Sequence, residues 1–379
     1  MTLPLEDIRV IDSANQYPGP YCTMLLGDLG AEIIKVERPG LGDPARILPW
    51  FFGSINRNKK SLTLDLKKKE SGDILRRLVE KSDVLTEGFR PGVAGKIGLD
   101  WEALQKINPR LIYCSISGYG QEGPYRNMPG HDLNYMAMSG MLGCFRDMEG
   151  NLVKPGIAIG DLSSGMFAAI GIMAALAARE KTNRGQFVDV SMFDGLVSWM
   201  STILGKHFAK APFYVFDDPG YGIFRASDGK SFTLGIAHEN WFWERLCDVT
   251  GLKEFRGLDA TERRVRWDEL TAELRQVFAC KPRKEWILAL LEADVPVAPV
   301  KAVEEVAMDP HVAFREMIQA KSWKSSEVRF QVNFPIKLFD TPAELRLAPP
   351  ELGEHNCEIL KWLGYLPEEI EKFAKNRVI

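Results

Sequence analysis

The stretch from residue 9 to residue 37, RVIDSANQYPGPYCTMLLGDLGAEIIKVE, places a helical pattern between two short β-rich runs. We predict strands at 9–12 and 32–36 and a helix at 20–29. The alternation continues through the first third of the chain, with strands predicted at 61–66, 83–86 and 111–116 and helices at 68–79 and 101–106. This order is typical of βαβ units and a mostly parallel sheet, which binds ligands at the carboxyl ends of its strands.

Three properties of the sequence argue against particular classes of ligand and site. The net charge of −3 argues against nucleic acid as the main partner, since duplex binding usually needs a basic face. The segment after the first predicted strand reads DSANQYPGPY rather than GxGxxG, so an NAD site is not supported. The 6 cysteines form no CxxC pair and have no zinc spacing with His, which favours a reducing, cytoplasmic location and no metal site.

No membrane segment is expected from the sequence. The start, MTLPLEDIRV, lacks the basic and apolar regions of a signal peptide. The longest apolar run, 166–178, is about half as long as a membrane span, and we predict that it forms a buried helix.

The sequence pattern changes near residue 220. The segment GIFRASDGKSFTLGI predicts a β-hairpin around Asp228 and Gly229, and helical stretches follow at 239–249, 260–278 and 283–293. We therefore expect an α/β protein with two domains. The predicted ranges are 1–219 and 326–379 for a Rossmann-like large domain and 220–325 for a smaller α+β domain.

Asp161 is the first candidate for chemistry. It lies in GIAIGDLSSGM, directly before a helix of small residues. A lone Asp at such a position most often only caps the helix. The alternative is that the free N–H groups and the helix dipole hold an ionised carboxylate, which can act as a nucleophile or a base. The residues alone leave both interpretations open.

His131, in MPGHDLNYMAMSG, and Glu239, in GIAHENWFWERLC, are further candidates. A loop histidine is more often solvated or structural than catalytic, and a first-turn glutamate is more often a partner of the helix dipole. In the functional interpretation His131 is a general base or proton donor, and Glu239 orients it or completes a polar network.

Cations gather around the strand ends predicted for the large domain. Each one alone is an ordinary surface charge, but an α/β fold collects phosphorylated ligands at such places. A pyrophosphate with an extra phosphate needs several cations. The set consists of Lys35, Arg38, Arg46, Arg57, Lys59, Lys60, Arg90 and Lys96.

Ordered blocks of sequence match a known family over nearly the whole length of the chain. The blocks are PGPYCTMLLGDLGAEIIKVERPGLGD, NRNKKSLTLDLK, VLTEGFRPGVAGKIGLDWEAL, YCSISGYGQEGPYRNMPGHDLNY, GDLSSGMFAAIGIMAALAAREKTNRGQFVDVSMFDG and APPELGEHNCEILKWLGY. In these blocks the chain resembles the CaiB/BaiF group of class III CoA-transferases, which also contains α-methylacyl-CoA racemase. So many blocks in the same order make the resemblance specific.

The resemblance implies an interlocked homodimer, in which each subunit has a Rossmann-like large domain built from both chain ends. It also implies that coenzyme A binds at this domain as part of an acyl-CoA substrate, with a carboxylic acid as the other substrate and no metal or redox cofactor. The CoA contacts that it implies are Arg38, Arg57, Lys59, Lys60, Phe89 and Lys96.

The resemblance further implies two roles for Asp161. In the transferases the matching aspartate attacks the acyl thioester and then carries CoA as an aspartyl thioester. In the racemases the matching His131 and Asp161 are two bases on either face of the α-carbon, and Glu239 supports His131. The segment DLSSGM is closer to the transferase form, so a CoA-transferase is the leading hypothesis, with a racemase and a non-catalytic acyl-CoA binder as alternatives. Tyr17 stands where the oxalate-type transferases carry Gln.

Overall fold

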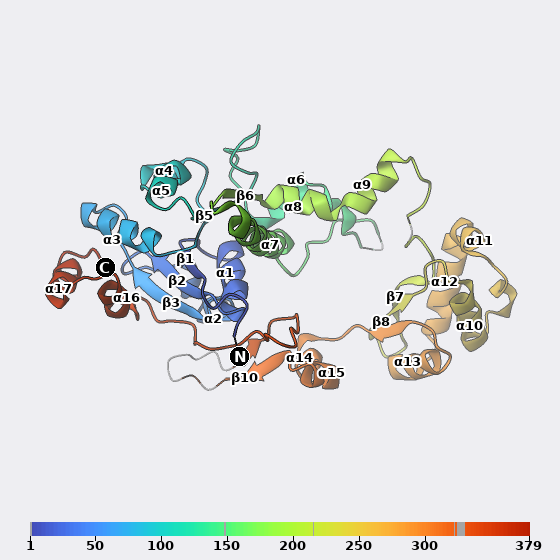
Figure 1. Ribbon diagram of the computed structural model, residues 1–379. Coiled ribbons are helices and arrows are strands. Elements are labelled where there is room, and N and C mark those ends of the chain that lie inside the picture. The colour runs from blue at the N-terminus through green and yellow to red at the C-terminus, as the bar shows by residue number, and fades with distance from the viewer. Residues whose placement is uncertain (1, 148, 215, 322, 324–329) are drawn as a thin grey trace. The chain divides into compact units, whose positions relative to one another are not determined.

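The computed structural model describes residues 2–147, 149–214, 216–321, 323 and 330–379. The chain forms two compact units, a large one made of Met1–Met200 and Phe314–Ile379 and a small one made of Ser201–Ala313 (Figure 1). The predicted start of the small domain, residue 220, lies inside the small unit. Its predicted end, at 325, lies outside the described residues.

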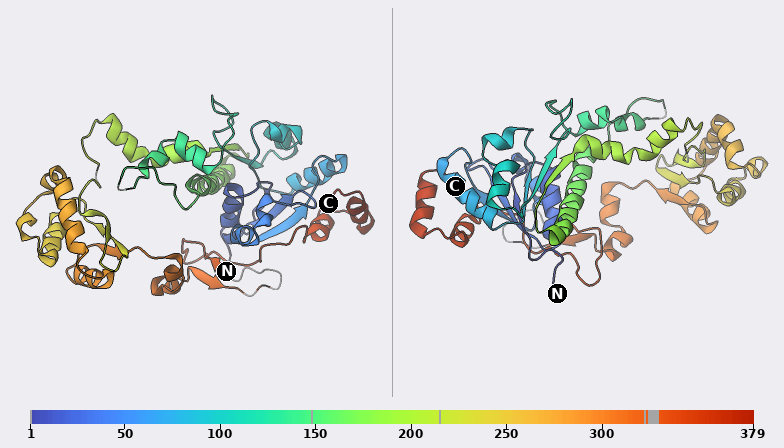
Figure 2. Two further views of the ribbon diagram at one scale, coloured as in Figure 1. Left: turned by 180° about the vertical axis from the view of Figure 1, so that it is seen from behind. Right: turned by 45° about the horizontal axis from the view of Figure 1, so that its top comes forward.

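A six-stranded parallel sheet forms the centre of the large unit (Figures 1 and 2). The strand order is β3-β2-β1-β4-β5-β6, which confirms the predicted parallel sheet. The order reverses between β1 and β4, and an open α/β sheet binds its ligand at such a switch point. The strands are β1 (Arg9–Asp12), β2 (Glu32–Glu37), β3 (Lys59–Thr63), β4 (Val84–Glu87), β5 (Ile112–Ser117) and β6 (Phe187–Ser191).

Helices from both ends of the chain pack on this sheet. One buried core joins side chains of β1, β2 and β3 to helices, among them Ile74 and Leu78 of an early helix and Ile359 and Leu360 of a late one. Apolar burial of this kind supplies most of the stability of such a layer. The helices that contribute to it are α3 (Lys69–Glu80), α5 (Trp101–Ile107), α16 (Asn356–Trp362) and α17 (Pro367–Lys375).

Helix α7 (Ile159–Thr182) packs along α1 (Pro18–Asp28) and along strands β5 and β6 (Figure 2). Among the described residues it is the one helix long and apolar enough to cross a membrane, and 50% of its most apolar window is buried inside the chain. Buried Ala168, Ala169 and Ile172 lie on its inner side. The inner side of the helix is therefore buried, as predicted for 166–178, whereas its other side, with Met166, Ile170 and Met173, is exposed in this chain.

Replacing Gly165 with alanine is expected to destabilise the large unit by about 1–3 kcal/mol. A Cβ at this position of α7 would lie 2.7 Å from the backbone oxygen of Pro18 and 3.0 Å from the Tyr21 ring, so α1 would have to move away. Gly72→Ala in α3 is the matched control, because its Cβ would meet nothing within 4 Å and alanine favours a helix. Urea unfolding measures both variants, and a Gly165→Ala protein as stable as the wild type would contradict this close packing.

The small unit is built on the predicted hairpin. Strands β7 (Tyr221–Arg225) and β8 (Ser231–Gly235) pair antiparallel, and β9 (Val297–Pro299) joins them as a third strand. Gly229 has a φ of +74° at the turn, a conformation that glycine adopts without a steric penalty. This confirms the hairpin that was predicted from the two strand-like runs around Asp228 and Gly229.

Helices α10 (Asn240–Thr250), α12 (Trp267–Phe278) and α13 (Arg283–Glu292) share a core with this small sheet. Their fully buried aromatic rings include Trp243 and Phe278. The single helix predicted at 260–278 is wrong, because the chain forms two helices there. Arg266, with φ −97° and ψ 27°, separates α11 (Ala260–Val265) from α12.

Candidate active site

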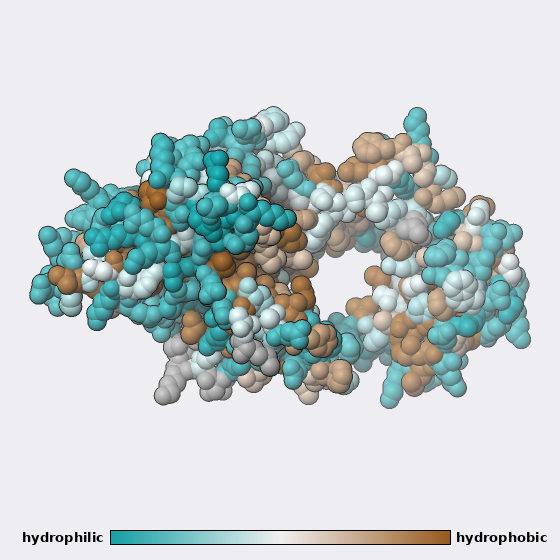
Figure 3. All heavy atoms as spheres, viewed as in Figure 1, coloured by the Kyte–Doolittle hydropathy of each residue, from teal (hydrophilic) through white to brown (hydrophobic). Residues whose placement is uncertain are grey.

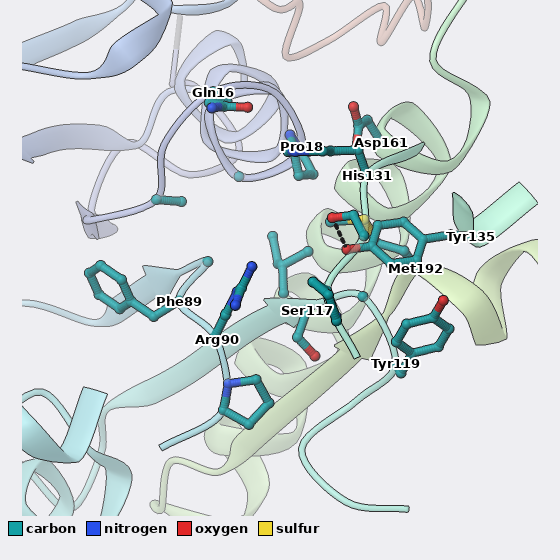
Figure 4. Close-up of a pocket in the computed structure, with 18 of the residues that line it drawn as sticks. Gln16, Pro18, Phe89, Arg90, Ser117, Tyr119, His131, Tyr135, Asp161 and Met192 are labelled. Carbon is teal, nitrogen blue, oxygen red and sulfur yellow. Dashed lines mark hydrogen bonds between the residues drawn. The ribbon is translucent and has the colours of Figure 1, made fainter. Parts of the chain in front are cut away.

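A cleft of about 810 Å³ lies at the switch point of the large unit. Its wall comes from the loops that follow β1, β4 and β5, from the segment before α6 (Asp132–Met138), and from the start of α7. Figure 4 shows His131, Asp161, Tyr135 and Arg90 around this cleft. The structure thus brings His131 and Asp161, which are 30 residues apart in the sequence, to one site within one unit.

Asp161 lies in the first turn of α7 and does not cap this helix. The N-cap residue is Ala158, and the carboxylate of Asp132 takes over the capping role by accepting hydrogen bonds from the backbone N–H groups of Gly160 at 2.6 Å and Asp161 at 3.3 Å. The capping interpretation of Asp161 is therefore wrong. Its side chain remains free to face the cleft.

The electrostatics of Asp161 also differ from the sequence-based expectation. Burial, followed by the negative charge of Asp132, raises the pKa of Asp161 to about 7. The helix dipole was expected to keep this carboxylate ionised, but burial and the like charge of Asp132 favour its protonated form instead. A carboxylate with a pKa near neutrality is a better base and nucleophile when it is ionised than an ordinary aspartate.

The tyrosines that line the cleft include Tyr17, which the resemblance matches to a Gln of the oxalate-type transferases, and Tyr135, which was not identified from the sequence. Tyr17 lines the same cleft as Asp161, and burial, followed by the negative charge of Asp161, raises the pKa of Tyr17 above its ordinary value. The Tyr135 hydroxyl donates a hydrogen bond to the backbone oxygen of Gly130 at 2.6 Å (Figure 4). Tyrosines in helices are too common for the sequence alone to single out Tyr135.

The floor of the cleft carries a further polar group. The Ser117 hydroxyl at the end of β5 is buried and has no hydrogen-bond partner among the described residues. Leaving a buried hydroxyl without a hydrogen bond destabilises the folded chain by about 1–3 kcal/mol. A ligand atom that pairs with this hydroxyl would remove the penalty and so bind more tightly. Arg90 lines the same cleft and is exposed to it.

A second cleft of about 490 Å³ adjoins the first one, since both are lined by Asn15, Pro44 and Phe89. Arg38 also lines the second cleft, and Lys96 is the last residue of α4 (Val93–Lys96), directly before Ile97 of its wall. The Glu87 carboxylate accepts a hydrogen bond from the Phe89 backbone N–H at 2.6 Å and holds this loop in place. Together the clefts can accept one elongated ligand.

Three of the cations that were expected to contact CoA have a different position in the structure. Lys59 and Lys60 lie within β3 instead of before it, and Arg57 is 2% exposed. Each of these three cations forms an ion pair with one or more carboxylates of the large unit, and these ion pairs hold the cations in place. The pairs are Arg57 with Asp28 at 2.6 Å, Lys59 with Asp12 at 3.0 Å, and Lys60 with Glu32 at 2.9 Å and Glu358 at 2.6 Å.

Glu239 lies in the small unit, where it precedes α10. Its carboxylate accepts hydrogen bonds from the backbone N–H groups of Ala237 at 2.9 Å and His238 at 3.1 Å. Partial burial acts to raise the pKa of Glu239. These hydrogen bonds outweigh that effect, so the pKa of Glu239 lies below its ordinary value. Its support of His131 stays a prediction.

The chain matches CoA-transferase family III over residues 5–356. It belongs to this family. Among relatives, it is 36% identical to acetyl-CoA:oxalate CoA-transferase of Acetobacter aceti, covering 94% of this chain and 95% of that one. It is also 36% identical to human α-methylacyl-CoA racemase, covering 100% and 98%. A solved CAIB/BAIF family protein of Brucella suis shares its structure with a TM-score of 0.84 at 29% identity, covering 96% and 100%.

These relatives confirm the resemblance that was identified from the ordered sequence blocks. The relatives also confirm that this chain is an enzyme of family III, since several of them are named as CoA-transferases. The presence of a racemase among equally similar relatives means that identity alone does not choose the reaction. Among the described residues, no group of three or more His, Cys, Asp and Glu side chains is arranged to hold a metal ion.

Proposed function

We propose that this chain is a CoA-transferase that moves CoA between an acyl-CoA thioester and a free carboxylic acid. The observation that carries the proposal is the position of Asp161, which faces a cleft at the switch point of the sheet and is relieved of helix capping by Asp132. Relatives named as transferases act on oxalate, malate and mesaconate, which supports a carboxylic acid as the second substrate.

In the proposed reaction an Asp161 oxygen attacks the thioester carbonyl. The carbon–sulfur bond breaks, which leaves an acyl-aspartyl anhydride and a CoA thiolate. The thiolate then attacks the aspartyl carbonyl, so that the first acid departs as a carboxylate and CoA is held as an aspartyl thioester. The acceptor acid repeats the two steps in reverse order, and Asp161 is regenerated. No net proton or electron is transferred in this sequence.

Racemisation of a 2-methylacyl-CoA is the second candidate function. It is favoured by the presence of His131 and Asp161 in one cleft, since two bases can remove and return a proton on opposite faces of the α-carbon. The human racemase relative supports the same alternative.

One experiment separates the two functions. The protein is incubated with a panel of acyl-CoAs in deuterium oxide, with and without carboxylic acids, and the products are analysed by mass spectrometry. A transferase forms a new acyl-CoA only when an acceptor acid is present and leaves the α-hydrogen in place. Deuterium at the α-carbon without an acceptor acid would assign the racemase, and an inert protein that binds CoA would assign a binder.

We place the nucleotide part of CoA in the second cleft and the thioester beside Asp161. The shared wall at Asn15, Pro44 and Phe89 supports a single ligand that extends through both clefts. Arg38, Phe89 and Lys96 remain its candidate contacts from the sequence analysis. Arg90 joins them, because it lines the reaction cleft beside Phe89.

Arg38→Ala is expected to raise the Kd for acyl-CoA about tenfold, because one charge-assisted contact to a phosphate is worth about 1.5–3 kcal/mol. Lys60→Ala is the comparison variant, and it is expected to change the Kd less than about twofold, since its ammonium is paired with Glu32 and Glu358. Isothermal titration of Asp161→Ala double variants with acyl-CoA, which cannot turn over, measures both values. A larger loss in Lys60→Ala than in Arg38→Ala would reverse this assignment of contacts.

The proposed homodimer is supported by apolar surface on the large unit. Met166, Ile170 and Met173 follow helical spacing along one side of α7 and are 43%, 53% and 38% exposed. Figure 3 shows hydrophobic side chains at the surface of the chain. A second copy that covers this side of α7 would remove it from water, which favours association. That the two copies interlock stays part of the proposal.

A further inference from the structure

A pair of opposite charges is buried beneath the edge of the reaction cleft. The Lys35 ammonium, in β2, lies 2.9 Å from the Asp43 carboxylate, and neither side chain is exposed at all. The cost of removing two charges from water often exceeds their attraction, so a buried pair is weak evidence for a stabilising role. The other contacts of these two side chains indicate what the pair does.

Both charged groups bind the backbone that forms the edge of the cleft. The Asp43 carboxylate accepts the Gln16 backbone N–H with both of its oxygens, at 3.0 and 3.2 Å. The Lys35 ammonium donates to the Ala14 backbone oxygen at 2.9 Å, and the Asp12 carboxylate accepts from the Ala14 N–H at 3.2 Å. Buried charged groups therefore form hydrogen bonds with three backbone atoms of this segment, the nitrogen and oxygen of Ala14 and the nitrogen of Gln16.

The backbone held in this way is strained. Gln16 has a φ of +64°, in the left-handed region that costs a residue with a side chain about 1–2 kcal/mol. Such a conformation persists only where the surroundings determine it, and here the Asp43 carboxylate does so. The Gln16 side chain is exposed at the cleft (Figure 4), and the next residue, Tyr17, lines the same cleft as Asp161.

We propose that Asp43, held by Lys35, is a positioning residue that sets the backbone of residues 14–17 so that Gln16 and Tyr17 face the cleft of Asp161. It touches no substrate and acts through the strained Gln16 backbone. The kinetic part of its test rests on the proposed function, and the structural part does not.

The test compares Asp43→Ala with the conservative Asp43→Asn, whose side-chain oxygen can still accept the Gln16 N–H. Asp28→Asn is the matched control, since Asp28 forms another buried pair of the large unit, with Arg57, and lines neither cleft. Hydrogen–deuterium exchange of residues 13–17 reports on the loop without any substrate. The kcat and KM for CoA transfer report on its consequence.

In Asp43→Ala we expect the Gln16 amide to exchange about tenfold faster and kcat to fall at least about tenfold, with a smaller change in KM for acyl-CoA. Asp43→Asn should recover most of both values. Asp28→Asn should lower the melting temperature but keep kcat within about twofold. Unchanged exchange at Gln16 in a folded Asp43→Ala protein would overturn the proposal, as would an equal kcat loss in Asp28→Asn.

If Asp43→Ala does not fold, Gln16→Pro replaces it. Proline has no N–H and cannot adopt a positive φ, and residue 16 is exposed, so the buried charges stay in place. We expect the same loss of kcat, and a full kcat in this variant would overturn the proposal. A wild-type protein with no activity would instead count against the proposed function, while exchange of the Gln16 amide in a folded Asp43→Ala protein would still decide the role of Asp43.

Discussion

Asp161→Ala is expected to lower kcat for CoA transfer by at least about 1000-fold, because without this nucleophile the covalent intermediates cannot form. Binding of CoA should change less than about threefold, since Asp161 lines only the reaction cleft and not the second one. Steady-state kinetics and calorimetric titration separate the two effects. Asp194→Ala is the matched control, because Asp194 is also an acid in the first turn of a helix, α8 (Met192–Trp199), but lines neither cleft.

The same carboxylate should be trapped during turnover of the wild-type protein. Hydroxylamine added with acyl-CoA should convert an aspartyl thioester into a hydroxamate, and peptide mass spectrometry would place the modification at residue 161. An Asp161→Ala protein that keeps a tenth of the wild-type kcat, or a modification found only at another acid, would contradict the proposed mechanism. A wild-type protein that yields no trapped adduct and exchanges the α-hydrogen without an acceptor acid would favour the racemase alternative.

The activity is expected to depend on pH through the ionisation of Asp161. Its pKa is about 7, raised by burial and then by the charge of Asp132, and only the ionised form can attack. The kcat/KM should therefore be constant well above pH 7 and fall about tenfold for each pH unit below it, to about a hundredth at pH 5. A profile that stays flat down to pH 5 would exclude Asp161 as the attacking group.

Asp132→Asn shows whether this pH dependence belongs to Asp161. The substitution removes the neighbouring negative charge, while the remaining side-chain oxygen can still accept the Gly160 N–H. The midpoint of the profile should therefore move to lower pH. Asp194→Asn, which removes an exposed charge outside both clefts, should leave the midpoint in place.

The pH dependence of stability follows the same group. Asp161 binds its proton more tightly in the folded chain than in the unfolded chain, where its pKa is 3.8. Its contribution therefore lowers the free energy of unfolding as pH rises from about 4 to about 7 and keeps it lower above pH 7. This opposes the requirement of catalysis for the ionised form, as is common where active sites hold buried charge.

Several features of the chain follow from local sequence. Repeating β-rich and helical segments predicted the parallel sheet, because side-chain periodicity is a local property. The Asp228–Gly229 pair predicted the hairpin, since only a few residues accept its backbone angles. Asp161 and His131 were both identified as candidates, although only their resemblance to family motifs suggested that they act together.

Other features depend on contacts between distant segments. Lys59 and Arg57 look like phosphate ligands in the sequence, yet Asp12 and Asp28 bury and neutralise them. Asp132 looks like a neighbour of His131, yet it caps α7 and raises the pKa of Asp161. Whether a charge binds a ligand or a partner depends on which opposite charge lies nearest in space.

The sequence by itself determined the family, the parallel sheet and the acid at residue 161, because ordered motifs and side-chain periodicity depend only on the order of residues along the chain. Only the tertiary structure decided which charges are free at the clefts and which are paired inside the large unit. The physical reason is that burial and pairing act over a few ångströms in space, and the groups involved, such as Asp43 and Gln16, lie far apart along the chain.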